Sequence, residues 1–367
     1  MTGPADLDGA SAAPLHPAAR DVLLAALDRG YADPRRLHRP GREARLLLDN
    51  AREVTAQALG VRPDEVTFTP TGTHAVHLGL LGLASRGLRD GLPLAHTAVE
   101  HSAVLHAARW AGTPVSVPVD HTGRVLLAEV PSLAAVMACQ AANHEVGTLQ
   151  PVAAVREQTD APLFLDACTS GGRLPLPEAW DAAALSAHKW GGPAGVGILL
   201  VRKRARWHHP FPTDDRVDER STGFENVPAV LAAAASLQAV VAERDEVNAR
   251  QHALVDVVRR RVAAEVPDVE VVGDPDDRLP HLVTFSCLYV DGEALVTELD
   301  RRGFGIASGS ACTSSTLTPS HVLEAMGVLS HGNVRLSLQR DATREQVDAF
   351  CDAVPEVVRE LRSRVGL

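Results

Sequence analysis

Cysteines are too few and too scattered in this sequence of 367 residues to form a disulfide framework or a structural zinc site. They are odd in number and no two of them make a C-x-x-C pair: Cys139, Cys168, Cys287, Cys312 and Cys351. Free thiols persist in a reducing compartment, so we predict a cytoplasmic location and expect that one of these thiols is reactive.

Basic residues do not dominate either. The chain has 36 lysines and arginines against 46 aspartates and glutamates, which gives a formal net charge of −10 and a pI near 5.9. Sequence-independent binding to nucleic acid needs a basic surface, so we expect no nucleic-acid partner.

Long apolar runs are absent as well, because no segment reaches the roughly 20 apolar residues of a membrane helix. The nearest, residues 230–242 (VLAAAASLQAVVA), is shorter and contains Ser236 and Gln238, so it predicts a buried helix and no membrane partner. The opening MTGPADLDGASAAPLHP has no basic start followed by an apolar run, and we expect no signal peptide.

Helical and strand-like patterns alternate between about residues 42 and 181, and residues 183–207 add two more strands around a Gly-rich loop. Short apolar strands separated by helices are typical of a mainly parallel sheet covered on both faces, which predicts an α/β fold. Ligands of such sheets bind beyond the carboxyl ends of the strands. Helices are expected in residues 42–60, 71–87 and 102–112, and strands within residues 64–70, 92–101, 136–147, 162–172 and 183–207.

The order of elements changes in the last third of the chain. Two helices, at residues 228–244 and about 247–266, precede a mixture of strands and helices that predicts a smaller α+β domain. A chain of this length exceeds one ordinary core. We predict a large domain of residues 15–246 and a small domain of residues 1–14 and 247–367.

Lys189 and Asp166 stand at the ends of apolar strands. A desolvated lysine has a lowered pKa and forms Schiff bases, although a surface lysine at a strand end is the alternative. A pyridoxal phosphate ring takes a carboxylate beside its pyridine nitrogen, a role open to Asp166, although a turn or N-cap aspartate is common.

Three further segments could bind the rest of such a cofactor and its substrate. Thr71, Gly72 and Thr73 open a helical run, where amides and hydroxyls suit a phosphate or serve only as an N-cap. His101, at a strand-to-helix junction, can stack on an aromatic cofactor, move protons, or be structural. Arg335 alternates with apolar neighbours and needs an anionic partner, either a substrate carboxylate or a structural carboxylate.

Cys312 lies in SGSACTSS, residues 308–315, where no large side chain is available to anchor the segment by packing. Such a segment permits a thiol to move between two positions. A small buried side chain is the alternative reading.

Together and in this order, these segments resemble the cysteine desulfurase family, within the class V aminotransferase group of pyridoxal-phosphate enzymes. LDGASAAPLHPAAR is close to the family's LDNAATTPLHP opening, and RRLHRPGREARLLLDNAREVTAQALG continues the resemblance. SAHKWGGPAGVGILLVRK matches the Schiff-base lysine segment, and SGSACTSS matches the catalytic-cysteine loop. The resemblance covers nearly the whole chain.

The resemblance implies a role for each candidate. Lys189 would be the Schiff-base lysine, Asp166 would hold the pyridine nitrogen, and His101 would stack on the ring and act in catalysis. The remaining roles are phosphate binding (Gly72, Thr73, Ser186 and His188), ring-hydroxyl contacts (His144 and Thr169), substrate binding (Arg335 and Asn143) and the nucleophilic thiol (Cys312).

The implied reaction converts L-cysteine to L-alanine and leaves a persulfide on Cys312, which passes to a protein or small-molecule sulfur acceptor. The implied fold is type I of the pyridoxal-phosphate enzymes, like aspartate aminotransferase, with a seven-stranded large domain and a small C-terminal α+β domain. The family also implies a homodimer.

Several positions depart from the family pattern. Thr169 stands where a glutamine contacts the ring hydroxyl, and His144 stands where an asparagine is expected, next to Asn143. Phe224 replaces a threonine that would reach the partner subunit's phosphate, which Ser221 or Thr222 could replace. The opening threonines are alanines, and the segment from Cys312 to Arg335 is shorter than in members with long mobile loops. We interpret the chain as a specialised member.

Two other functions remain open at this point. A pyridoxal-phosphate C–S lyase or selenocysteine lyase would use the same lysine for β-elimination without needing Cys312. A catalytically weakened homologue would act as a partner in a sulfur-transfer complex, which the altered ring contacts would favour.

Overall fold

The computed structural model describes residues 5–213, 220–308, 319–364 and 366. Its main sheet has the strand order β2-β8-β7-β6-β5-β3-β4, in which β8 runs antiparallel to both of its neighbours and the other adjacent pairs are parallel. This confirms the expected α/β fold with a mainly parallel, seven-stranded sheet. The strands are β2 (Val66–Thr69), β3 (Leu94–Thr97), β4 (Val115–Val117), β5 (Val136–Gln140), β6 (Leu163–Asp166), β7 (Ala182–Ser186) and β8 (Gly197–Val201).

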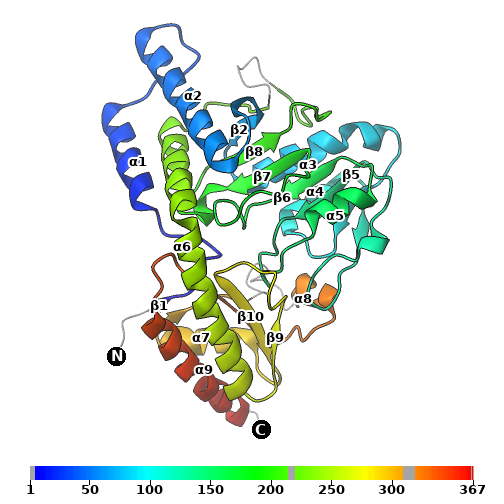
Figure 1. The fold of residues 1–367 in the computed structure, drawn as a ribbon, viewed down its shortest axis with the longest axis vertical. Coiled ribbons are helices and arrows are strands. Elements are labelled where there is room, and N and C mark those ends of the chain that lie inside the picture. Colours follow the sequence, from blue (N-terminus) through cyan, green and yellow to red (C-terminus); the bar gives the residue numbers. More distant parts are fainter. Residues whose placement is uncertain (1–4, 214–219, 309–318, 365, 367) are drawn as a thin grey trace.

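Helices cover both faces of this sheet, which is why its central strands are apolar along their whole length (Figure 1). Leu163 and Leu165 of β6 join the core under α2 (Arg39–Leu59), α5 (Val152–Gln158) and α6 (Val227–Glu265). Phe164, between them, faces the opposite core under α3 (Gly72–Arg89) and α4 (Ser102–Ala111). The alternation follows from the two-residue period of a strand.

A second group of elements forms its own core around Leu7, Phe285 and Phe350. An antiparallel sheet of order β12-β10-β9 and a parallel pair β1-β11 make up its strands. β1 brings the N-terminal segment into this group. The division into domains at residue 246 stays a prediction. The elements are β1 (Ala5–Asp6), β9 (Val269–Val272), β10 (Leu282–Cys287), β11 (Phe304–Gly305), β12 (Asn333–Ser337), α7 (Gly292–Arg301), α8 (His321–Met326) and α9 (Arg344–Arg364).

Helix α6 corrects one prediction, because residues 227–265 form a single helix of 39 residues and not two. Neither glycine nor proline interrupts the sequence between the two predicted helices, so no residue there stops the helix. The apolar pattern changes because the partner changes: the first half packs on α1 (Pro17–Arg29) and α2, and the second half packs on α9 (Figure 1).

By length and composition alone, α6 would also be long enough to cross a membrane. Half of its most apolar stretch is buried within the protein, and the core helix of a soluble protein passes the same test, so this is weak evidence.

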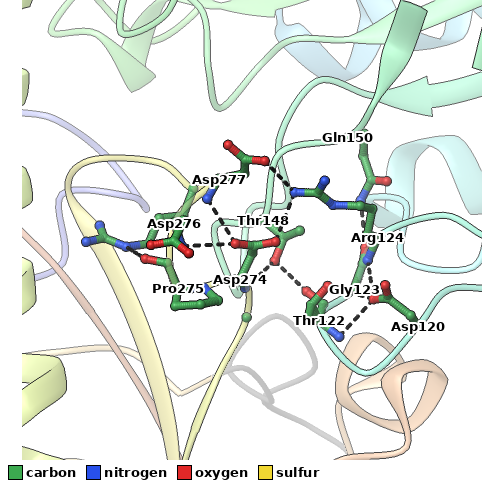
Figure 2. Close-up of polar contacts among 12 residues, drawn as sticks. Asp120, Thr122, Gly123, Arg124, Thr148, Gln150, Asp274, Pro275, Asp276 and Asp277 are labelled. Atoms are coloured by element: carbon green, nitrogen blue, oxygen red, sulfur yellow. Dashed lines mark hydrogen bonds and ion pairs between the residues drawn. The ribbon is translucent and has the colours of Figure 1, made fainter. Parts of the chain in front are cut away.

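Residues 141–150, the junction loop, contact the second group of elements: Thr148 bridges to Arg278, and Thr284 donates to the carbonyl of Glu145. Figure 2 shows the polar network on one side of this junction. Arg124 Nη2 lies 2.9 Å from Asp274 Oδ2 and 2.9 Å from Asp277 Oδ2. Thr148 Oγ1 donates to the carbonyl of Thr122 and accepts from the amide of Asp274. The network joins the loop at residues 120–125, the junction loop and the segment before β10.

We expect Arg124→Gln and Asp274→Asn to be energetically coupled by about 0.5–1 kcal/mol, because their ion pair is only partly exposed. Asp274 is 15% exposed, whereas Asp277 is 68% exposed, so Asp277→Asn is the matched control and should couple less. Urea unfolding of the single and double variants measures both couplings. A larger coupling to Asp277 would contradict this account of the junction.

Candidate active site

The carboxyl ends of β6 and β7 bring together the three residues on which the predicted site depends. Asp166 ends β6, and Lys189 lies in the single-turn 3₁₀ helix η3 (Ala187–Lys189) directly after β7. His101 caps α4, and its Nδ1 accepts the amide proton of Ala103 at 3.1 Å. Burial lowers the pKa of His101; the charge of Asp166 opposes this shift, and that of Lys189 adds to it. Asp166 and Lys189 are therefore close enough to His101 for their charges to affect its ring.

A cradle suited to a phosphate lies where α3 begins. Adding a Cβ at Gly72 would place it 2.6 Å from Ser186 Cβ, so glycine is what allows the start of α3 to approach the end of β7. Ser186 Oγ lies 3.0 Å from His188 Nδ1, and Thr73 is exposed in the first turn of α3. The unpaired amides of a helix N-terminus carry partial positive charge. The cradle thus contains each residue predicted to bind phosphate.

The amine of Lys189 is held by the opening segment of the chain. Nζ donates to the carbonyl of Ala10 at 2.6 Å and to that of Ser11 at 3.2 Å. The amide of Ala13 donates to the carbonyl of His188. The sequence did not predict the contacts of the Ala10 and Ser11 carbonyls, because every residue type has a backbone carbonyl and no residue type indicates which one binds a lysine. The only signal was the resemblance of LDGASAAPLHP to a family motif that lies far from the lysine in sequence.

His144 lies beside His101, with ring centroids 5.1 Å apart and planes at 75°. Burial lowers the pKa of His144 well below its usual value, and the charges of His101 and Arg335 add to the shift. Its Nδ1 is buried without a hydrogen-bond partner among the described residues. An orphaned buried nitrogen here fits a group that binds next to the His101 ring.

Asn143 and Thr169 are both buried. Asn143 Oδ1 accepts from the amides of Glu145 and Val146 at 2.8 Å, and Nδ2 donates to the carbonyl of Val99 at 3.1 Å. These bonds occupy the amide in shaping the junction loop. Substrate binding by Asn143 and cofactor binding by Thr169 stay predictions.

Arg335 lies on β12 and is buried. Its Nη2 lies 2.9 Å from Asp8 Oδ1 and 2.8 Å from Ser11 Oγ, and Nη1 donates to the carbonyl of His144. Its Nε has no partner among the described residues. A carboxylate partner within the protein is therefore present, and contact with a substrate carboxylate stays a prediction.

Cys312 lies outside the described residues, so its role as nucleophile stays a prediction. The described residues that flank it are placed beside the site: Ala307 bridges to Arg335, and Ser320 Oγ donates to Glu145 Oε2 at 2.7 Å. Burial raises the pKa of the other four thiols, to about 12 for Cys287 and Cys351. Only a thiolate is a strong nucleophile, so these four are poorly suited to the reaction.

Comparison with known proteins shows similarity over nearly the whole chain. A family model for aminotransferase class-V matches residues 6–350. The cysteine desulfurase IscS of Dictyoglomus turgidum is 31% identical over 97% of this chain and 95% of its own length. The IscS-like cysteine desulfurase of Mycobacterium tuberculosis is 34% identical over 97% and 96%. A solved structure of a NifS-like protein matches with a TM-score of 0.88 and 27% identity, over 98% of this chain and 100% of that one.

The chain therefore belongs to the class-V aminotransferase family, with the type I fold of pyridoxal-phosphate enzymes. Within that family it is a cysteine desulfurase. Membership implies pyridoxal 5′-phosphate as cofactor, and three features described above fit such a group: the Gly72 cradle, the buried Asp166 carboxylate at a strand end, and the orphaned His144 nitrogen.

We expect Gly72→Ala to weaken binding of pyridoxal phosphate by roughly tenfold or more, because a methyl group at this position forces α3 away from Ser186 at a cost of about 1–3 kcal/mol. Gly305→Ala in β11 is the matched control, since its added Cβ would meet no atom closer than 3.9 Å. Titration of the two apo-proteins with the cofactor, followed by absorption, measures the difference. Equal affinities of the two variants for the cofactor would show that Gly72 is not needed for phosphate binding.

Proposed function

We propose that this enzyme takes sulfur from L-cysteine, releases L-alanine, and carries the sulfur as a persulfide on Cys312 until a protein or small-molecule acceptor removes it. The observation that carries the proposal is the convergence of Lys189, Asp166 and His101 at the carboxyl edge of the sheet, next to the Gly72 cradle. The altered ring-contact positions, His144 and Thr169, are what favours a weakened partner protein, and no separate observation favours a lyase.

The cofactor site proposed here uses the chain's own groups in distinct roles. Thr73, Ser186 and His188 would hold the phosphate at the start of α3, and Asp166 would hold the pyridine nitrogen. Lys189 would anchor the cofactor covalently. When bound, pyridoxal phosphate supplies an electron sink that stabilises negative charge at the substrate Cα.

His101 would contribute a neutral ring. Because burial lowers its pKa, the side chain is neutral at neutral pH. Its Nδ1 accepts a backbone proton from Ala103, which places the ring proton on Nε2. The ring is therefore able to stack on the cofactor and to donate a hydrogen bond from Nε2.

Lys189 and Arg335 would handle the substrate. Once its Nζ leaves the carbonyls of Ala10 and Ser11, Lys189 would remove a proton from the substrate Cα. Arg335 would bind the substrate carboxylate through its guanidinium, which already makes charge-assisted bonds to Asp8 and Ser11. The substrate carboxylate would then compete with Asp8 for the guanidinium nitrogens of Arg335.

The sulfur step would use the thiolate of Cys312. Its sulfur forms a bond to the substrate sulfur as the substrate Cβ–S bond breaks, and the electron pair of that bond remains with Cβ. A proton added at Cβ and a proton returned to Cα, which Lys189 would supply, complete L-alanine. The enzyme retains the sulfur as a Cys312 persulfide, which requires no oxidant.

A homodimer is part of the proposal. Tyr31 and Phe224 expose aromatic rings whose centroids lie 6.2 Å apart. By the resemblance to the family, Phe224 stands where a threonine would reach the partner subunit's phosphate. An apolar surface at this position is suited to burial against a second subunit.

Product analysis tests the proposal. With L-cysteine and a thiol reductant, we expect alanine and sulfide in equal amounts from the wild-type enzyme and at least a hundredfold less from Cys312→Ala, since the reaction needs the thiolate. Cys351→Ala is the matched control, because Cys351 is buried in the core around α9, away from the site, and should retain turnover.

Pyruvate in place of alanine, or full activity of Cys312→Ala, would contradict the proposal and assign a C–S lyase reaction. Failure of the purified protein to bind pyridoxal phosphate would instead favour the weakened partner.

A further inference from the structure

Glu100 is a second carboxyl group at this site, and no step described so far uses it. It directly precedes His101, and its residue is 0% exposed. Its Oε1 accepts two hydrogen bonds, from Thr97 Oγ1 at 2.6 Å and from the amide of Gln140 at 2.8 Å. Its Oε2 is buried without a hydrogen-bond partner among the described residues.

These bonds connect the segment that carries His101 to the end of β5. Gln140 is the last residue of β5 and lies opposite Asp166 in the register of β5 and β6. The Gln140 side chain donates to the carbonyl of Val99, just before Glu100. Glu100 is thus placed between the residue predicted to stack on the cofactor and the strand beside the residue predicted to hold its nitrogen.

The surroundings of Glu100 favour its neutral form. Burial raises its pKa to about 8, and the charge of Asp166 from β6 adds to the shift, while the bonds from Thr97 and Gln140 oppose it. The carboxyl group also faces Cys139 of β5, whose thiol pKa it helps to raise, and His321 of α8 contacts its backbone carbonyl. An ionised carboxylate with one unpaired buried oxygen is costly, and two adjacent carboxylates disfavour each other's charge.

We propose that Glu100 is a positioning residue that works as a neutral carboxylic acid: it fixes the His101 segment to the end of β5 and keeps a second negative charge away from Asp166. The inference rests on the proposed function, in which His101 and Asp166 hold the cofactor. It adds to that function a group that touches neither cofactor nor substrate.

Two variants distinguish the hydrogen-bonding role of Glu100 from a role of its charge: Glu100→Gln removes the ionisable group and keeps an acceptor, and Glu100→Ala removes both. Glutamine retains an acceptor at the Oε1 position and is neutral, so cofactor affinity and turnover should stay within about threefold of wild type. Alanine leaves the Thr97 hydroxyl and the Gln140 amide unpaired, and cofactor affinity should fall roughly tenfold or more. If both variants lose cofactor affinity and turnover equally, Glu100 does not act as a neutral acid. If Glu100→Ala keeps wild-type affinity and turnover, Glu100 is not a positioning residue.

Infrared spectroscopy of the apo-protein measures the protonation state directly. A buried protonated carboxyl group should give a carbonyl band that disappears in Glu100→Gln and titrates in wild type with a pKa of about 8. This readout is independent of cofactor and turnover, so it distinguishes failure of the inference from failure of the proposed function. The absence of such a band at neutral pH would overturn the proposal, even where Glu100→Ala does not fold.

The free energy of unfolding should fall as pH rises, as expected for a carboxyl group whose pKa is raised by folding. The pKa of Glu100 is raised in the folded protein from 4.5 to about 8, so the folded state binds this proton more tightly. The resulting stabilisation is fully present below the lower value and is lost as pH rises toward the higher one. Thermal unfolding should show wild type losing stability relative to Glu100→Gln across this window, and a constant difference would contradict the raised pKa.

Discussion

Lys189 and Arg335 come from different parts of the fold and are held by the same few residues of the opening segment. Lys189 donates to the carbonyls of Ala10 and Ser11, and Arg335 binds Asp8 and the Ser11 hydroxyl. Arg335 is buried and Lys189 is partly buried, so both cations need oxygen partners within reach, and this segment provides them. The remainder of the site depends on this contact, because it brings the edge of the main sheet next to β12.

The junction loop, residues 141–150, applies the same constraint from the other side. Arg335 donates to the carbonyl of His144, Thr284 to that of Glu145, and the network around Arg124 holds Thr148. The loop that places His144 beside His101 is therefore fixed by both groups of elements. A shift of the small group relative to the sheet would displace the site itself.

The central strands and the positions of two site residues could be predicted from the sequence, because the apolar pattern of a buried strand is a local property. Apolar runs predicted the central strands, and polar residues at their ends predicted Asp166 and Lys189. The continuous α6 was missed because a change of packing partner looks like a break in the apolar pattern. Glu100 and the Ala10 and Ser11 carbonyls were missed because their importance depends on contacts between segments distant in sequence. The nearest carboxylate to Arg335, Asp8, was likewise visible only in three dimensions.

The chemistry requires one reactive thiol among five, and burial raises the pKa of the four that the structure describes. The most direct test is to expose the enzyme to L-cysteine without reductant, alkylate it, and locate the persulfide by mass spectrometry of its peptides. The account predicts the extra sulfur on the peptide that contains Cys312. A persulfide on Cys168 or on one of the buried cysteines, or none on any peptide while alanine forms, would contradict it.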